Sequence, residues 1–266
     1  MTLSVAWIRK VNNTEELMVA TDSRLRWGRA WDCCPKIFPL VRQDSVLCFA
    51  GNTQYAYPMM LQINNSLSMH GKSSSRALDI TDVKGHILKV IEGMRDHIHD
   101  LPRGSDAFEA PDALFIFAGY SWKTQSFKIW TYYYDPKTDK FSCKKASSHR
   151  KKLDGTKYYA FIGDNLDIAR KKTTELLIEK GLGDKPGLDM EPLEVLIEMI
   201  RDEKYPHIGG SPQVVKVYKH MNTMPYSVYW PNKESNQKTF LGRPMLDYEV
   251  NEYFVLDPDT MKLEKN

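Results

Sequence analysis

Cysteine is scarce in this sequence, and long apolar runs are missing from it. The four cysteines are Cys33, Cys34, Cys48 and Cys143, of which two are adjacent and none forms a Cys-x-x-Cys pair. This usage favours reduced, mostly structural thiols in a reducing compartment rather than disulfides. No run approaches the length needed to span a bilayer, and the first ten residues lack the features of a signal peptide. We therefore expect a soluble, cytoplasmic protein with no membrane partner.

A strong excess of one charge is also absent. The 37 Lys and Arg residues against 34 Asp and Glu leave a net charge of +3, and the basic residues are interspersed with acids rather than gathered into a stripe. Nucleic acid is therefore not an expected partner. The densest basic run, at residues 149–152, precedes Asp154-Gly155, and we predict that it is a solvated loop.

The overall composition is typical of one large globular domain. Hydrophobic residues make up 42% and charged residues 27% of the 266 residues, which allows a substantial core. Internal repeats, low-complexity tracts and linkers are absent from the sequence. We therefore interpret residues 1–266 as a single domain.

The N-terminal residues predict a β-hairpin. Apolar and polar residues alternate from Thr2 onward, which indicates a strand, and polar residues near Asn12 indicate a turn before a second strand. If the turn is centred near Asn12, antiparallel partners have residue numbers that sum to about 24. This register places Asp22 opposite Thr2.

Periodicity and turn residues predict strands and paired helices over the rest of the chain. We expect strands at 36–38, 46–51, 114–118, 127–132, 158–162 and 214–218, a terminal hairpin of 253–256 with 261–263, and helices through 59–61, at 80–99, from 164 or 165 to 181, and at 192–203. Because the helices come in pairs, a doubly wound parallel sheet is disfavoured. The order predicts an α+β fold, a four-layer αββα sandwich of two antiparallel sheets flanked by helix pairs.

Seven short segments are similar to segments of proteasome β subunits and their simpler bacterial relatives, and they occur in the family's order. They are Met1-Thr2; Ala20-Thr21-Asp22-Ser23-Arg24; Lys36-Ile37-Phe38; Phe49-Ala50-Gly51; Ala118-Gly119-Tyr120; Phe161-Ile162-Gly163-Asp164-Asn165; and Ile208-Gly209-Gly210. Their joint order and spacing is more specific than any one of them. The chain therefore resembles the N-terminal nucleophile (Ntn) hydrolases of the proteasome type over most of residues 2–220. Residues 221–266 form a C-terminal extension with no matching segment.

This resemblance implies a threonine peptidase. Thr2 would be the nucleophile, and its own freed α-amine would be the general base. Lys36 would lower the pKa of that amine and polarise the hydroxyl, while Asp22 holds the lysine in place. The backbone N–H of Gly51 would donate to the oxyanion, at a position where the lack of a Cβ permits close approach. We expect no cofactor and no metal.

The resemblance also bears on activation and partners. The amine exists at Thr2 only after Met1 has been removed. Threonine is small enough for an ordinary methionine aminopeptidase, so we expect that no long propeptide is required. The relatives further imply a peptide or unfolded-protein substrate, a homo-oligomeric ring and an AAA+ unfoldase as partner.

The sequence departs from the family pattern at four positions. Asp164 stands where active members usually carry a serine near the threonine amine, and its carboxylate would raise the pKa of the amine or pair with Lys36. Tyr205 and Ile208 stand where many β subunits carry an Asp and a Ser. Phe49 stands at the position whose side chain forms the floor of the first specificity pocket in relatives. We therefore expect its ring to favour small substrate side chains or to leave little space in the pocket.

Other interpretations of the same residues stay open. His97 and His99 could suggest a metal site, but on a helix they face different sides. The adjacent cysteines at 33 and 34 could suggest thiol catalysis, although strand packing suits them better. Gly163-Asp164-Asn165 suits a helix cap as well as an active site.

Two functions other than peptide hydrolysis also fit the sequence. A catalytically impaired scaffold or binding subunit of a ring would keep the fold, and the residues at 164, 205 and 208 would allow it. An Ntn amidohydrolase that acts on small amides would keep the nucleophile.

Overall fold

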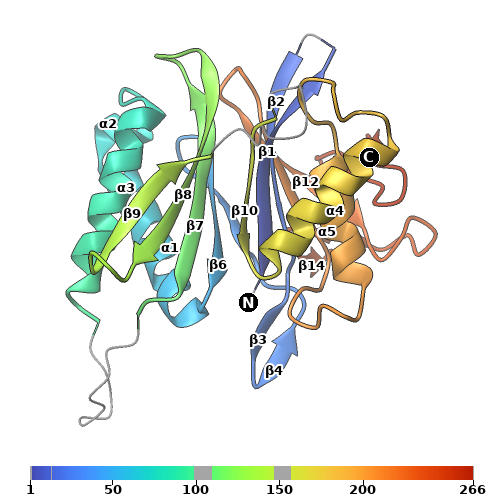
Figure 1. Cartoon of the computed structure of the whole chain (residues 1–266), viewed down its shortest axis with the longest axis horizontal. Coiled ribbons are helices and arrows are strands. Elements are labelled where there is room, and N and C mark those ends of the chain that lie inside the picture. The colour runs from blue at the N-terminus through green and yellow to red at the C-terminus, as the bar shows by residue number, and fades with distance from the viewer. Residues whose placement is uncertain (1, 13, 99–109, 147–156, 266) are drawn as a thin grey trace.

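Two large β-sheets with helices on their outer faces organise the chain, as Figure 1 shows. The computed structural model describes residues 2–12, 14–98, 110–146 and 157–265. The basic run at 149–152 and the predicted helix end at residue 99 lie outside these ranges. Among the described residues, none of the helices is both long and apolar enough to cross a membrane.

The first sheet has nine strands in the described chain. These are β1 (Leu3–Val11), β2 (Thr14–Thr21), β10 (Tyr159–Gly163), β11 (Gln213–Val217), β12 (Thr223–Tyr229), β13 (Lys238–Phe240), β14 (Arg243–Pro244), β15 (Val255–Leu256) and β16 (Leu263–Glu264). Their order is β10-β1-β2-β11-β12-β13-β14, with β15 and β16 joined beside β12. The strands that follow residue 221 thus continue the sheet that holds the N-terminus.

The second sheet has five strands in the order β5-β6-β7-β8-β9. They are β5 (Ile37–Pro39), β6 (Ser45–Gly51), β7 (Ala113–Ser121), β8 (Ser126–Asp135) and β9 (Lys140–Lys145). A separate two-stranded sheet, β3 (Leu25–Trp27) with β4 (Arg29–Trp31), precedes β5. The α+β class with antiparallel sheets agrees with the sequence-based prediction, except that β12 and β15 run parallel.

Helices cover one face of each sheet. They are α1 (Thr53–Met69), α2 (Gly71–Ser74), α3 (Ile80–Arg95), α4 (Leu166–Glu179) and α5 (Glu191–Arg201). One apolar cluster joins α1 and α3 to the five-stranded sheet, and another joins α4 and α5 to the nine-stranded sheet. A third cluster takes residues from both sheets, among them Ala6, Val19 and Ile116.

Helix α3 illustrates how local sequence fixes an element. Its N-cap, Asp79, accepts a hydrogen bond from the backbone N–H of Thr81 at 2.9 Å, which satisfies one of the free N–H groups of the first turn. The buried residues of the helix recur at helical spacing and form one apolar face toward the sheet. They are Ile80, Val83, Ile87 and Ile91.

The register of the first hairpin differs from the predicted one by one residue. Ser4 pairs with Thr21 and Val11 pairs with Thr14, so Asp22 is not opposite Thr2 in the ladder. Asn12 has a φ of 53°, which is typical of the two-residue turns that join antiparallel strands. The numbers of paired residues therefore sum to 25 rather than to 24.

A buried ion pair anchors the connection between β5 and β6. Arg42 Nε and Asp44 Oδ1 lie 2.6 Å apart, and neither side chain is exposed. The Arg42 guanidinium also donates to the carbonyl oxygens of Ser73 and Leu78, at 3.0 and 2.7 Å. The pair therefore ties this connection to α2 and to the segment before α3.

We expect Arg42→Met to lower the free energy of unfolding by about 3–5 kcal/mol, because the substitution leaves a buried carboxylate without its partner. Urea unfolding followed by circular dichroism measures this loss. Lys171→Ala is the matched control, since it removes an exposed pair with Glu175 and should cost less than about 0.5 kcal/mol. Equal losses in the two variants would refute the anchoring role of Arg42.

Candidate active site

The candidate site lies at one end of the core between the two sheets, where polar side chains take the place of apolar ones. Ser4, Thr21 and Gln213 are neighbours across β1, β2 and β11, because Ser4 pairs with Thr21 and Thr21 with Gln213. Their side chains lie on the same face of the sheet as those of Ala6 and Val19, which pack in the core between the sheets. Ser4 Oγ lies 2.7 Å from Thr21 Oγ1 and donates to the carbonyl oxygen of Phe49 at 3.1 Å.

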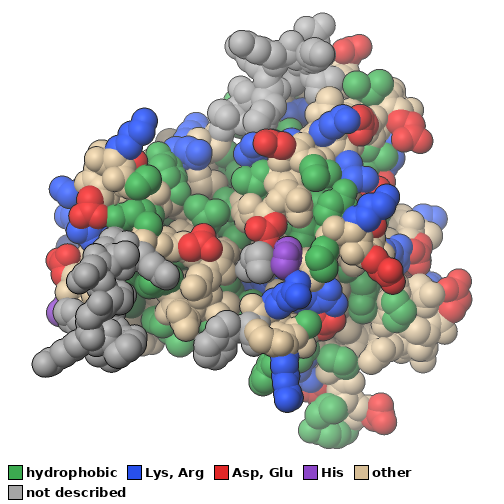
Figure 2. Space-filling model, turned by 60° about the horizontal axis from the view of Figure 1, so that its bottom comes forward, with side chains coloured by type: hydrophobic (Ala, Val, Ile, Leu, Met, Phe, Trp, Pro, Cys, Tyr) green, Lys and Arg blue, Asp and Glu red, His purple; other side chains and the backbone are tan. Residues whose placement is uncertain are grey.

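Figure 1 places the N-terminus at the same end of the molecule as β3 and β14, and Figure 2 turns this end toward the viewer. Acidic, basic and hydrophobic side chains are interspersed on the face shown in Figure 2. No stripe of one charge is visible among the coloured atoms of that view, as the sequence leads one to expect.

Lys36 is the centre of the site. It immediately precedes β5, and its side chain has no exposed surface. Its Nζ donates to Thr2 Oγ1 at 2.6 Å, to Asp22 Oδ1 at 2.8 Å and to the carbonyl oxygen of Arg24 at 2.5 Å. The three donors of the ammonium thus all have acceptors, as a buried charge requires.

Asp22 is held on both of its carboxylate oxygens. Oδ1 accepts from Lys36 Nζ and from the backbone N–H of Leu3 at 3.2 Å. Oδ2 accepts from the N–H groups of Arg24 at 3.1 Å and Gly209 at 3.0 Å. Because β2 ends at Thr21, the Asp22 side chain is free of the strand alternation and reaches Lys36 despite the shifted register.

Asp164 holds the first residue of the site. Its backbone N–H donates to the carbonyl oxygen of Thr2 at 2.7 Å, and its Oδ2 accepts from the backbone nitrogen of Thr2 at 3.2 Å. In this chain that nitrogen is the amide that joins Thr2 to Met1, and it stands for the α-amine of a processed chain. Gly163 must be a glycine, since its φ is 106° and a Cβ would lie 1.9 Å from the Thr2 carbonyl oxygen.

The segment 163–165 both contacts Thr2 and begins α4, so its place in an active site stays a prediction. Asn165 is the N-cap residue of α4, but its side chain makes no capping hydrogen bond. Its φ of 54° lies in the left-handed region, where asparagine is tolerated. The segment thus turns the chain so that the carboxylate of Asp164 faces the start of β1.

The charges of the site act on one another. Burial lowers the pKa of the Lys36 ammonium below its ordinary value, and the carboxylates of Asp22 and Asp164 act in the opposite direction. An ammonium of lowered pKa beside a hydroxyl can exchange a proton more readily than an ordinary lysine. The arrangement is therefore suited to proton transfer at Thr2 Oγ1.

Gly51 lies at the end of β6, as expected. Its φ is 101°, and a Cβ would lie 2.4 Å from the carbonyl oxygen of Asp112. The backbone therefore requires glycine here, and a donor role toward an oxyanion stays a prediction. Phe49 is fully buried and its ring meets Tyr57 edge to face, with the centroids 5.0 Å apart. The ring lies in the cluster with α1 and α3, so its role at the floor of a specificity pocket also stays a prediction.

The positions that depart from the family pattern take other roles. Ile208 is buried in the cluster under α4 and α5, and Tyr205 is partly buried against it. Neither supplies a polar contact to the site, but the next residue, Gly209, donates its N–H to Asp22. Asp202 accepts from the backbone N–H of Lys204 at 3.0 Å instead.

Sequence reasoning missed Gln213. Its side chain is fully buried and accepts from the backbone N–H of Lys36 at 2.9 Å. The available signal was the alternation of β11: Gln213 shares a face with Val215 and Val217, which enter the core between the sheets. A polar residue at such a position needs a buried partner.

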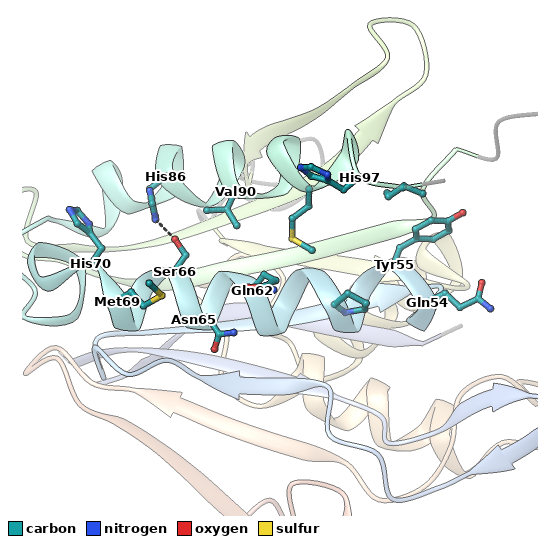
Figure 3. Close-up of a pocket in the computed structure, with 13 residues that line it drawn as sticks. Gln54, Tyr55, Gln62, Asn65, Ser66, Met69, His70, His86, Val90 and His97 are labelled. Atoms are coloured by element: carbon teal, nitrogen blue, oxygen red, sulfur yellow. Dashed lines mark hydrogen bonds between the residues drawn. The ribbon is translucent and has the colours of Figure 1, made fainter. Parts of the chain in front are cut away.

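A large groove in the described structure lies away from the site. A groove of about 1040 Å³ lies between α1 and α3, on the side of the five-stranded sheet away from the site. Figure 3 shows His70, His86 and His97 along it, with His86 Nε2 2.7 Å from Ser66 Oγ. Within the described ranges, no three His, Cys, Asp or Glu side chains lie close enough to hold a metal. The other histidine of the sequence pattern, His99, lies outside those ranges.

The chain has the fold of known proteasome-like proteins. Anbu from Hyphomicrobium sp. strain MC1 superposes with a TM-score of 0.56, at 16% identity, over 83% of this chain and 84% of that chain. A mutant of Anbu from the same strain gives a TM-score of 0.55, also at 16% identity, over 84% and 86%. Anbu is a proteasome homologue with the Ntn-hydrolase fold, so the resemblance read from the sequence is confirmed at the level of the fold. No protein-family model and no curated protein matches the chain.

The cysteines near the site should differ sharply in reactivity. Cys33 is exposed and Cys48 is buried, and burial raises the pKa of the Cys48 thiol to about 12. Burial also raises the pKa of Cys34, which disfavours a thiolate nucleophile there. At pH 8 we expect iodoacetamide to modify Cys33 at least about a hundredfold faster than Cys48, because the thiolate is the reactive form. Peptide mass spectrometry measures both rates.

The urea-unfolded chain is the control, in which Cys33 and Cys48 should react at similar rates. Equal rates in the folded protein would show that the strand carrying Cys48 is not packed between the sheets.

Proposed function

We propose that this protein is an N-terminal threonine hydrolase that cleaves peptide bonds with Thr2 after removal of Met1. One observation carries the proposal: the buried Lys36 ammonium lies 2.6 Å from Thr2 Oγ1 and 2.8 Å from Asp22 Oδ1. A hydroxyl, a cation and a carboxylate in this order are the groups that activate an N-terminal nucleophile.

The reaction would proceed through an ester. The free α-amine of Thr2 takes the proton of the hydroxyl as Oγ1 attacks the substrate carbonyl carbon. The N–H of Gly51 is the proposed donor to the oxyanion. Collapse of the tetrahedral intermediate breaks the C–N bond, and the leaving amine takes the proton from the Thr2 ammonium. Water then hydrolyses the ester and restores the hydroxyl.

The proposal takes the molecule as the four-layer αββα sandwich of Ntn hydrolases. It is supported by the helix-side clusters on each sheet, the cluster between the sheets, and the similarity to Anbu. By the same resemblance we propose peptides or unfolded proteins as substrates, assembly into a ring of like subunits and delivery by an AAA+ unfoldase. Small amides are the alternative substrate class, since the same nucleophile would cleave them.

A second candidate function has its own observation. Asp164 Oδ2 lies 3.2 Å from the Thr2 nitrogen, and a carboxylate there stabilises the protonated amine. A protonated amine cannot act as the base. This contact favours a scaffold or binding subunit with impaired catalysis, and the pH dependence of Thr2 reactivity distinguishes the two functions.

We expect the protein isolated from the cytosol of an expressing cell to have the mass of the chain without Met1, and a β-lactone probe to acylate Thr2. Intact-mass and peptide mass spectrometry measure both. Thr2→Ala should abolish labelling, and Lys36→Met should slow it by at least about a hundredfold, because both remove groups at the reacting oxygen.

Thr124→Val is the matched control, because Thr124 is exposed in the turn between β7 and β8, where its hydroxyl contacts Ser126 Oγ, at the other end of the sheet from Gly51. A chain that keeps Met1, or a processed chain that never labels, would refute the peptidase and favour the scaffold.

The pH dependence of labelling should respond to Asp164. The carboxylate favours the charged forms of both the Thr2 amine and Lys36, so its removal lowers both pKa values. We expect Asp164→Ser to shift the acidic and alkaline limbs of the profile to lower pH by about one unit and to raise the rate at pH 7. Second-order rates of β-lactone labelling between pH 5 and pH 10 test this.

Asp167→Ser, in the exposed first turn of α4, should leave the profile in place. An unchanged profile in Asp164→Ser would mean that this carboxylate does not act on the amine.

A further inference from the structure

Gln213 uses every hydrogen-bonding position of its side chain. Oε1 accepts from the backbone N–H groups of Lys36 at 2.9 Å and Ile37 at 3.3 Å. Nε2 donates to the carbonyl oxygen of Cys34 at 2.7 Å and to Ser23 Oγ at 2.9 Å. A primary amide has two donors and two acceptor sites, so this buried side chain is fully satisfied.

These bonds fix the backbone that carries Lys36. The N–H of Lys36 is held by Gln213, and its carbonyl oxygen accepts from the N–H of Phe49 at 3.3 Å. Gln213 itself is placed by the ladder, in which it pairs with Thr21. One side chain therefore connects the segment before β5 to the end of the nine-stranded sheet.

The C-terminal extension holds this side chain from its other side. The turn between β13 and β14 consists of Leu241 and Gly242, with φ values of 45° and 95°. A Cβ on Gly242 would lie 2.4 Å from Ser23 Oγ and 2.9 Å from Gln213 Nε2. Leu241 packs against the apolar cluster between the sheets. The tip of this hairpin thus closes the core beside the candidate site.

We propose that Gln213 and the Leu241-Gly242 turn form a clamp that positions Lys36 against Thr2, which makes the C-terminal extension a part of the active-site structure. The inference rests on the proposed function in that Thr2 reactivity is one of its readouts. Gln213 is a positioning residue here, because it touches the backbone of Lys36 and acts through its ammonium. A displacement of about 1 Å at a reacting group is enough to slow a reaction greatly.

The first test is Gln213→Met, which keeps the size of the side chain and removes all four hydrogen bonds. We expect the rate of Thr2 labelling by the β-lactone probe to fall by at least about tenfold. Gln237→Met is the matched control, since Gln237 is exposed in the same extension and should keep the native rate.

The second test uses Gln213→Glu. A protonated carboxyl keeps one acceptor and one donor and resembles the amide, whereas the carboxylate repels the Cys34 carbonyl oxygen. Burial raises a carboxyl pKa, so more of the variant carries the protonated, amide-like form at pH 6 than at pH 8. The ratio of the variant's labelling rate to the native rate should therefore rise at least about threefold as the pH falls from 8 to 6. The same ratio for Gln213→Met should stay flat. A purely structural defect would give two flat ratios and overturn the positioning role.

The third test addresses the turn. Gly242→Ala introduces a Cβ against Ser23 and Gln213 and should slow labelling by at least about fivefold. Gly181→Ala is the control, because Gly181 also has a positive φ, 62°, but has no atom within 4 Å of an added Cβ. Equal rates in these two folded variants would show that the extension does not act on the site.

A readout independent of Thr2 separates this inference from the proposed function. Acetic anhydride at pH 8, followed by peptide mass spectrometry, reports the accessibility of Lys36, which has no exposed surface in the native chain. Gln213→Met and Gly242→Ala should each raise Lys36 acetylation at least about fivefold, while Gln237→Met and Gly181→Ala should leave it unchanged. If the native protein is never labelled at Thr2, the proposed hydrolase is refuted. Lys36 acetylation still tests whether Gln213 and the turn hold Lys36 in place. Unchanged acetylation in both clamp variants would overturn it.

Discussion

A lysine ammonium with no exposed surface needs an anion and hydrogen-bond acceptors around it, since the cost of removing a charge from water is otherwise several kcal/mol. At one end of the two sheets, the residues around Lys36 meet this requirement. Asp22 supplies the anion, and Thr2 and the carbonyl oxygen of Arg24 supply the remaining acceptors. Asp22 is in turn fixed by three backbone N–H groups from three separate segments. Strands far apart in the sequence are therefore held in one arrangement by one buried charge.

The same fold can support a hydrolase or an inert subunit, so the balance of charge at the site matters more than the architecture. Burial lowers the pKa of Lys36, and the carboxylates of Asp22 and Asp164 act against this shift. The relatives implied by the sequence usually carry a neutral serine where this chain has Asp164. Gly209 replaces part of the polar support that Tyr205 and Ile208 cannot give, because its backbone N–H donates to Asp22. The chain thus combines a buried Lys36–Asp22 pair beside Thr2 with a carboxylate at the Thr2 nitrogen.

Periodicity found the long elements and missed the short or irregular ones. The strand at 140–145 has three lysines among its six residues, and all three are exposed, so its apolar pattern is short. Strand β12 contains Pro225, which argues against a strand when only the sequence is read. The predicted hairpin register was wrong by one residue, because the strands pair from Val11 and Thr14 outward and the numbers of paired residues sum to 25 rather than to 24. Lys36, Asp22 and Asp164 were found through resemblance to a family, and the structure brings them together around Thr2. Gln213 was missed because its importance depends on partners 177 positions away in the sequence.

The sequence by itself determined the class of fold, the positions of the main helices and strands, and the residue types able to activate a threonine. Those properties follow from local alternation, helical spacing and a set of ordered motifs. Tertiary structure alone decided three contacts of the site. Gln213 holds the backbone of Lys36, Gly209 supports Asp22, and a turn near residue 242 lies against Ser23 and Gln213. The physical reason is that these contacts join strands with no common local pattern, so their geometry exists only once both sheets have packed.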